Sequence, residues 1–146
     1  MPNAKPLCIL LAPDSFKGSL DATDFCKITT QVIQELIPSA EVFSRPMSDG
    51  GEGFVDSFIC AGAGEVKSAW VAGPLGKKTK AKFAWQEESK TAIIEMAQAS
   101  GITKVRKEEL NPLSTHTYGT GQLIQQAIDL GAKKVILGLG GSATND

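Results

Sequence analysis

The strongest constraint on the fold is a short apolar run that is followed by a polar loop and an amphipathic helix. Residues 7–12 are all apolar, which is typical of a strand buried on both faces of a parallel sheet. Residues 14–18 form a polar, glycine-containing loop. Apolar and small residues then recur at helical spacing from Ser19, a suitable N-cap, to Ile37. This succession of strand, loop and helix predicts the opening of an α/β fold.

The same succession occurs a second time. Residues 41–47 have the character of a strand, residues 48–53 form a glycine-rich loop, and residues 52–61 predict a short helix that Gly62 ends. The first 62 residues are therefore expected to run strand, loop, helix, strand, loop, helix. Both loops lead from a strand end into a helix N-terminus, which is where open α/β sheets bind ligands.

The pattern changes after Gly62. Residues 65–72 and 79–85 predict two strands, and the alternation of apolar and polar residues in the second favours an antiparallel strand with one solvent-exposed face. We therefore predict an α/β portion over residues 1–70 and part of a second α/β domain over residues 71–146.

The remaining chain returns to alternating strands and helices. Residues 91–96 predict a third strand of this part, and Tyr118–Gly121 opens a helix that Gly131 ends. A strongly apolar strand over 134–139 follows, and then the glycine-rich segment 140–146.

Composition and cysteine usage exclude several classes of protein. Fifteen Lys and Arg residues against 16 Asp and Glu residues give a net charge of -1, which argues against a nucleic-acid-binding protein. No apolar run reaches the roughly 18 residues of a membrane span. Cys8, Cys26 and Cys60 lie among apolar residues without a CxxC pair, so we expect buried, reduced thiols and a cytoplasmic location. The sequence leaves the oligomeric state open.

Four glycine-containing loops carry the groups that can do chemistry. They are Asp14–Gly18, Ser48–Gly53, Tyr118–Gly121 and Gly138–Asp146. Glycine lets the backbone approach a phosphate closely, and free N–H groups at a helix start can bind it. Lys17 offers a point charge to a phosphate, and the carboxylates Asp49, Glu52 and Asp146 can hold Mg²⁺ or accept a proton. Neither the GxxxxGK[ST] loop nor the GxGxxG dinucleotide motif is present.

Seven short motifs follow one another along the chain. They are Ala12–Leu20 (APDSFKGSL), Pro46–Gly53 (PMSDGGEG), Gly73–Gly76, Ile94–Ala97, Asn111-Pro112, Thr117–Gly121 and Gly140–Asp146. In this order, and over essentially the whole chain, they resemble the bacterial-type glycerate kinase family.

The resemblance implies ATP-dependent phosphorylation of glycerate, with Mg²⁺ as the accompanying ion. It also implies two α/β domains, the first Rossmann- or flavodoxin-like, with the site in the cleft between them. Members of the family are more than twice as long, and their pattern continues beyond Asn145-Asp146. We therefore expect a truncated, N-terminal portion of such an enzyme, with little or no turnover as an isolated chain.

The expected site residues follow from these motifs. Asp49 is predicted as the catalytic base or a Mg²⁺ ligand, Glu52 is the second candidate, and Asp146 is a second metal ligand. Lys17 and Ser15 are expected to bind phosphate or the glycerate carboxylate, whereas Asp14 either binds a ligand or caps its own loop. The remaining predicted substrate- and nucleotide-binding residues are Gly50, Gly51, Gly53, Gly119, Thr120, Gly121, Gly140, Gly141, Ser142 and Asn145.

Two alternatives compete with this interpretation. One is a non-catalytic remnant that binds a nucleotide or an anion without turnover. The other is an unrelated nucleotide-binding oxidoreductase of doubly wound type, and the missing dinucleotide motif weighs against it. The motifs do not distinguish the 2-hydroxyl from the 3-hydroxyl of glycerate, or one stereoisomer from the other.

Overall fold

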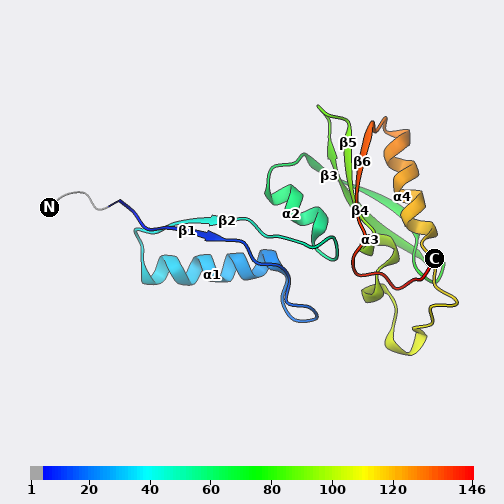
Figure 1. Ribbon diagram of the computed structural model, residues 1–146, viewed down its shortest axis with the longest axis horizontal. Helices are drawn as coiled ribbons and strands as arrows, with labels where there is room; N and C mark the ends of the chain where they lie inside the picture. Colours follow the sequence, from blue (N-terminus) through cyan, green and yellow to red (C-terminus); the bar gives the residue numbers. More distant parts are fainter. Residues whose placement is uncertain (1–4) are drawn as a thin grey trace. The chain divides into compact units, whose positions relative to one another are not determined.

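The computed structural model describes residues 5–146, which form six strands and four α-helices (Figure 1). The chain divides into two compact units, the first ending at Met47 and the second spanning Ser48–Asp146. The predicted boundary at residues 70 and 71 differs from this division and lies inside a strand of the second unit. Each unit is described by itself below.

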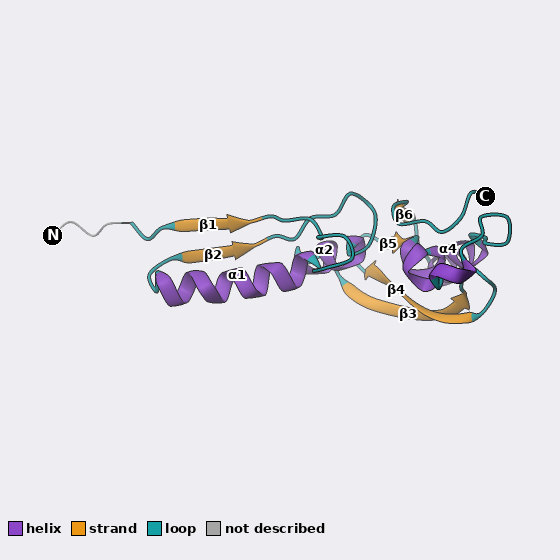
Figure 2. Cartoon of the chain, turned by 90° about the horizontal axis from the view of Figure 1, so that it is seen from below, coloured by secondary structure: helices purple, strands orange, loops and turns teal. Residues whose placement is uncertain are grey.

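The first unit is a parallel strand pair with one helix. β1 (Cys8–Leu11) lies beside β2 (Glu41–Ser44), and α1 (Ala22–Leu36) connects them along the chain (Figure 2). The N-cap of α1 is Asp21, whose Oδ1 accepts a hydrogen bond from the amide of Asp24 at 2.7 Å. The predicted cap, Ser19, lies instead in a turn that precedes the helix.

The apolar run 7–12, which contains β1, was predicted to be buried on both faces, and this prediction is wrong. Leu10 of β1 is 64% exposed and Phe43 of β2 is 47% exposed. The cause is that α1 is the one helix of this unit among the described residues, so it can cover only one face of the strand pair.

The second unit is built on a mixed four-stranded sheet. Its strands are β3 (Glu65–Ala72), β4 (Lys78–Gln86), β5 (Thr91–Glu95) and β6 (Lys134–Gly138), in that spatial order. The pairs β3–β4 and β4–β5 are antiparallel, as the alternation in β4 indicated, whereas β5 and β6 are parallel. Every residue of β5 is buried.

Helices cover both faces of this sheet. α2 (Phe54–Cys60) and α4 (Tyr118–Asp129) lie on opposite sides of the strands (Figure 1). The short helix α3 (Ala97–Ser100) and two 3-10 turns, Ile102–Lys104 and Lys107–Glu109, lead from β5 toward α4.

The core of this unit lies in two layers that follow the alternation of the strands. Phe83 and Ile94 face α4 and pack with Leu123, and all three side chains are at most 1% exposed. Ala84 and Ile93 face the other way and pack with Val55 of α2. Each fully buried large apolar side chain contributes about 1.5–3 kcal/mol. The predicted solvent-exposed face of β4 is therefore partly wrong, because α2 covers Ala84.

Two further expectations bear on the environment of the chain. All three cysteines are free, but only Cys26 is buried, whereas Cys8 and Cys60 are exposed. The prediction of three buried thiols is thus wrong for two of them, because both lie at element ends or on the open face of β1. Within residues 5–146, no helix combines the length and the apolar character that a membrane crossing needs.

Candidate functional site

Three loop segments of the second unit meet at the carboxyl end of its parallel strands. The amide of Met96, just after β5, donates to the carbonyl of Gly138 at the end of β6 at 2.9 Å. The amide of Gly140 donates to the carbonyl of Gly50 at 2.8 Å, which joins the loop before α2 to the loop after β6. In open α/β sheets this edge is where ligands bind, so the meeting point is the candidate site.

The two loops touch backbone to backbone through four glycines, Gly50, Gly51, Gly138 and Gly140, which we call the glycine contact. A Cβ atom on Gly140 would lie 2.6 Å from the Cα of Gly51, and one on Gly138 would lie 2.7 Å from the carbonyl oxygen of Gly50. Both distances are shorter than a side chain tolerates. Glycine is therefore required here for close approach rather than for flexibility.

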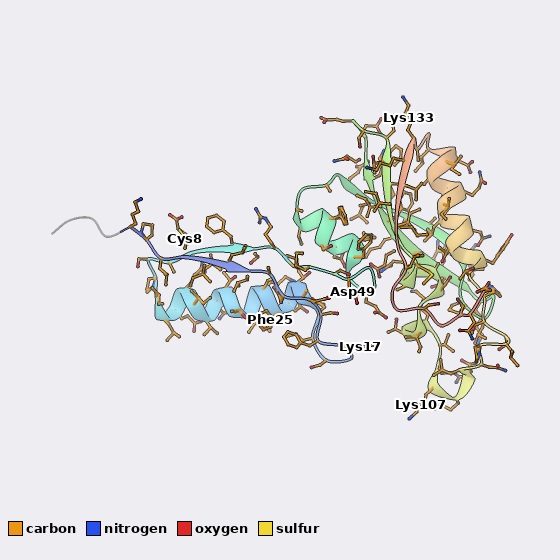
Figure 3. All side chains as sticks on the ribbon, in the orientation of Figure 1. Cys8, Lys17, Phe25, Asp49, Lys107 and Lys133 are labelled. Carbon is orange, nitrogen blue, oxygen red and sulfur yellow. The ribbon has the colours of Figure 1, made fainter. Side chains whose placement is uncertain are left out.

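Two carboxylates lie at the glycine contact. Oδ1 of Asp49 accepts a hydrogen bond from the amide of Gly51 at 3.0 Å, which fixes the side chain beside its own loop (Figure 3). The carboxylate of Glu52 lies over Gly141, where a Cβ atom would be 2.9 Å from each of its oxygens. The carboxylates of the two acidic residues that the sequence predicted as catalytic thus lie beside glycines of these two loops.

The start of α4 is capped by Asp146. Its Oδ2 accepts hydrogen bonds from the amide of Thr117 at 2.9 Å and from the hydroxyl of Thr117 at 3.2 Å. These hydrogen bonds, led by the one from the Thr117 amide, lower the pKa of the Asp146 carboxyl. Asp146 was predicted as a metal ligand, and in the structure its carboxylate accepts hydrogen bonds from Thr117, the N-cap residue of α4.

Of the three predicted phosphate-binding residues at this helix start, two point into the protein. A Cβ atom on Gly119 would overlap the carbonyl oxygen of Ala72, and the buried hydroxyl of Thr120 lies 2.7 Å from that of Ser100. Gly121 is different, because no atom lies within 4 Å of the position its Cβ would take. It borders a cavity of about 640 Å³ between α4 and β6.

The segment after the glycine contact is held against α3 and the turn that follows it. The carbonyl of Gly141 accepts from the amide of Ile102 at 2.8 Å, and the amide of Ala143 donates to the carbonyl of Ser100 at 3.0 Å. The hydroxyl of Ser142 accepts from the amide of Thr144 at 3.0 Å, so it stabilises its own turn. Asn145 is exposed.

The candidates of the first unit lie in the loop that follows β1. Oδ1 of Asp14 accepts from the amide of Ser15 at 2.6 Å, which is the kind of bond expected if Asp14 anchors its loop. Lys17 is exposed in the turn that the backbone bonds between Phe16 and Leu20 close (Figure 3). These residues belong to a different unit from the glycine contact.

The sequence analysis missed Glu95 as a residue of functional interest. It is the last residue of β5 and only 1% exposed. Its Oε2 accepts from the amide of Val55 at 3.1 Å, and its Oε1 accepts from Nε2 of Gln98 at 3.2 Å. Burial raises the pKa of this carboxyl. The available signal was a charged residue directly after a buried apolar run, at the carboxyl end of a strand.

The donor set fits a magnesium ion that arrives with a nucleotide. Among residues 5–146, no group of three or more His, Cys, Asp or Glu side chains is placed to hold a metal, so there is no all-protein cage. Mg²⁺ bound with phosphates needs only one or two carboxylates, because water and phosphate oxygens complete its shell. Asp49 meets that requirement, since one of its oxygens has no hydrogen bond among the described residues.

Comparison with known proteins finds one family and relatives that carry the same name. The profile described as "Glycerate kinase family" matches residues 9–146. The chain is 47% identical over 138 residues to the glycerate 2-kinase of Escherichia coli (strain K12), and 49% identical over 138 residues to a glycerate kinase of Halalkalibacterium halodurans. Each match covers 94% of this chain but only 36% of the relative.

A solved structure shares the fold of the chain. The crystal structure of a putative glycerate kinase 2 from Salmonella typhimurium LT2 superimposes with a TM-score of 0.74 at 41% sequence identity. The match covers 97% of this chain and 38% of that one.

Proposed function

This chain belongs to the glycerate kinase family, and from that premise we propose that it forms part of an enzyme that phosphorylates glycerate with ATP. The products would be ADP and a phosphoglycerate. Since the chain spans 36% of the length of its curated relatives, this activity is proposed for the complete catalytic unit. The observation that carries the proposal is the placement of Asp49 and Glu52 at the glycine contact.

Enzymes catalyse phosphoryl transfer mainly by positioning the reactants and by neutralising charge, and less by forming covalent intermediates. In the proposed reaction a hydroxyl oxygen of glycerate forms a bond to the γ-phosphorus while the bond to the bridging oxygen of ADP breaks. Asp49 accepts the proton of that hydroxyl, with Glu52 as the second candidate base. The amide of Gly140 already donates to Gly50, so the amide of Gly141 is the donor of this segment that we propose for a phosphate oxygen.

Cationic groups also take part in the proposed reaction. Bound Mg²⁺ would offset the negative charge of the phosphates, and Asp49 would hold it in the alternative assignment in which Glu52 is the base. Lys17, with Ser15 beside it, is proposed to bind a phosphate or the glycerate carboxylate. Three free cysteines suit a reducing compartment, so we place the activity in the cytoplasm.

A hybrid enzyme tests this function. Residues 9–146 of this chain replace the matched stretch of the E. coli glycerate 2-kinase, so that the rest of the family's length is supplied. We expect ADP release that depends on glycerate, with a phosphoglycerate as the product. The parent E. coli enzyme serves as the positive control, and the isolated chain is assayed in parallel. A folded hybrid without glycerate-dependent ADP release would contradict the proposal.

A further inference from the structure

We propose that the cavity between α4 and β6 binds the nucleoside half of ATP, its base and ribose, and not its phosphates. This inference rests on the proposed function. It reverses the sequence-based expectation that the start of α4 is a phosphate cradle.

The position of the cavity suits a ligand that reaches the glycine contact. It opens at the carboxyl end of β6 and the N-terminus of α4, the edge where α/β sheets bind ligands. Its volume of about 640 Å³ is within the usual range for small-molecule sites. Leu139, which lines it, lies in the chain between Gly138 and Gly140. A nucleotide whose base lies in the cavity would therefore extend its phosphates toward Asp49 and Glu52.

The charge of the lining disfavours an anion. All of the residues that line the cavity are described, and none of them is a lysine, an arginine or a histidine. The one ionisable acid among them, Asp146, already accepts the hydrogen bonds that the amide and hydroxyl of Thr117 donate. A phosphate or the carboxylate of glycerate would meet a negative charge there and find the amide of Thr117 engaged. A neutral nucleoside meets no such repulsion, and a carboxylate is a good acceptor for a ribose hydroxyl.

The walls suit a flat, largely apolar group. Ile124, Leu137 and Leu139 line the cavity together with Met96. Leu139 is 64% exposed and the ring of Tyr118 at the rim is 66% exposed. Aromatic rings are favourable stacking partners for nucleic-acid bases. A bound base would cover both exposed side chains.

Each of the two glutamine side chains at the cavity is engaged through one of its amide atoms. Oε1 of Gln122 accepts from the amide of Ala72 at 2.7 Å, and Nε2 of Gln125 donates to Asp129 at 2.9 Å. The groups that remain for a ligand are the apolar walls, Oδ1 of Asp146, Nε2 of Gln122, Oε1 of Gln125 and the Tyr118 hydroxyl, and none of them carries a positive charge. This combination favours recognition by shape and stacking over recognition by charge.

Gly121 allows a clean test, because its Cβ would point into open space. Gly121→Leu fills the cavity, and it also favours the helix because glycine is a poor helix former. Gln126→Leu is the matched control, since Gln126 is exposed on the same helix and does not line the cavity. Leu139→Ala is a second variant that removes a wall rather than filling the space.

The experiment titrates the 146-residue chain with adenosine and, separately, with tripolyphosphate, and follows backbone amide resonances by NMR. Adenosine should shift the signals of Tyr118, Gly121 and Leu139 saturably, and its affinity should fall at least tenfold in Gly121→Leu but not in Gln126→Leu. Leu139→Ala should weaken binding as well. Shifts of these signals by tripolyphosphate instead, equal binding by Gly121→Leu, or no adenosine binding at all would each overturn the inference.

A second readout separates this inference from the proposed function. In the hybrid enzyme, Gly121→Leu should raise the KM for ATP by tenfold or more and leave the KM for glycerate nearly unchanged. An active hybrid whose KM for ATP does not respond would overturn the nucleoside site and leave the kinase function standing. A hybrid without turnover, whose parent chain still binds adenosine at Gly121, would contradict the function and support the site.

Discussion

Oε2 of Glu95 lies 3.1 Å from the backbone nitrogen of Val55 and accepts its hydrogen bond. This bond joins the end of β5 to the first turn of α2, which directly follows the loop that carries Asp49 and Glu52. The bond is buried, where a lost partner is costly. The side chain of Glu95 is 1% exposed, so we infer that Glu95 positions the start of α2.

The protonation of Glu95 should make stability depend on pH. Burial raises its pKa above 4.5 in the folded chain, so the folded state holds this proton more tightly than the unfolded state. The stability it contributes is full below pH 4.5 and declines as the pH rises through the raised folded pKa. Glu95→Gln should flatten this slope in urea unfolding measured from pH 4.5 upward. Glu88→Gln, at an exposed position, is the control, and an unchanged slope in Glu95→Gln would contradict the assignment.

The ion pair between Arg106 and Glu109 should lower the pKa of the Glu109 carboxyl. The guanidinium of Arg106 donates two hydrogen bonds of 2.9 Å to Glu109 and is the main cause that lowers the pKa of Glu109 to about 2. Because the folded pKa is lowered, the benefit of this pair is present above pH 4.5 and is lost as the pH falls toward 2. NMR titration of the Glu109 carboxyl should show this value, and Arg106→Gln should move it back toward 4.5. Lys104→Gln, a nearby exposed charge, should have little effect.

Alanine substitutions at two glycines of α4 should change the free energy of unfolding in opposite directions. Gly119→Ala places a Cβ atom against the carbonyl of Ala72, whereas Gly121→Ala meets no atom within 4 Å. We expect Gly119→Ala to cost about 1–3 kcal/mol through overpacking. Gly121→Ala should gain up to about 1 kcal/mol from helix propensity. Chemical unfolding of the two variants provides the comparison, and a stable Gly119→Ala protein would show that α4 can shift away from β3.

Removal of the carboxylates at the glycine contact should lower kcat, whereas removal of the nearby carboxylate of Asp56 in α2 should not. In the hybrid enzyme, Asp49→Asn is expected to lower kcat by about 10²- to 10⁴-fold, the usual contribution of a positioned base. Glu52→Gln tests the second candidate in the same way. Asp56→Asn is the control, because Asp56 lies in α2 and its carboxylate forms an ion pair with Lys82, with a distance of 2.6 Å between Nζ and Oδ1. Near-normal kcat in Asp49→Asn would remove Asp49 from the chemistry.

Local patterns were sufficient to predict most elements of the fold. The helical spacing over 19–37 corresponds to α1, and the alternation over 79–85 corresponds to the antiparallel strand β4. What failed depends on partners distant in sequence. The burial of Ala84 depends on α2, and the exposure of Leu10 depends on how many helices cover β1. Alternation within one strand carries no information about either.

The sequence was sufficient to predict which loops form the candidate site, but not which of their residues contact one another. The order of the motifs pointed to Asp49, Glu52 and the glycines of 138–146, and the structure brings these two loops together. Nothing in the local sequence indicates that Gly119 faces Ala72 or that Asp146 caps α4. The first contact arises from the packing of α4 on β3, and the second arises because the segment after β6 reaches the start of α4. The functional roles of these residues stay predictions that the experiments above address.

The hydrogen bond from Gly140 to Gly50 also bears on the order in which this unit folds. It joins residues that are far apart in the chain, and the parallel pairing of β5 with β6 on which it depends is non-local as well. Closing long loops costs chain entropy that is recovered only after the contact forms. The glycine contact should therefore be among the last parts of this unit to assemble during refolding. Slow steps in refolding would then report on the maturation of the site itself, while the local β3–β4 hairpin forms early.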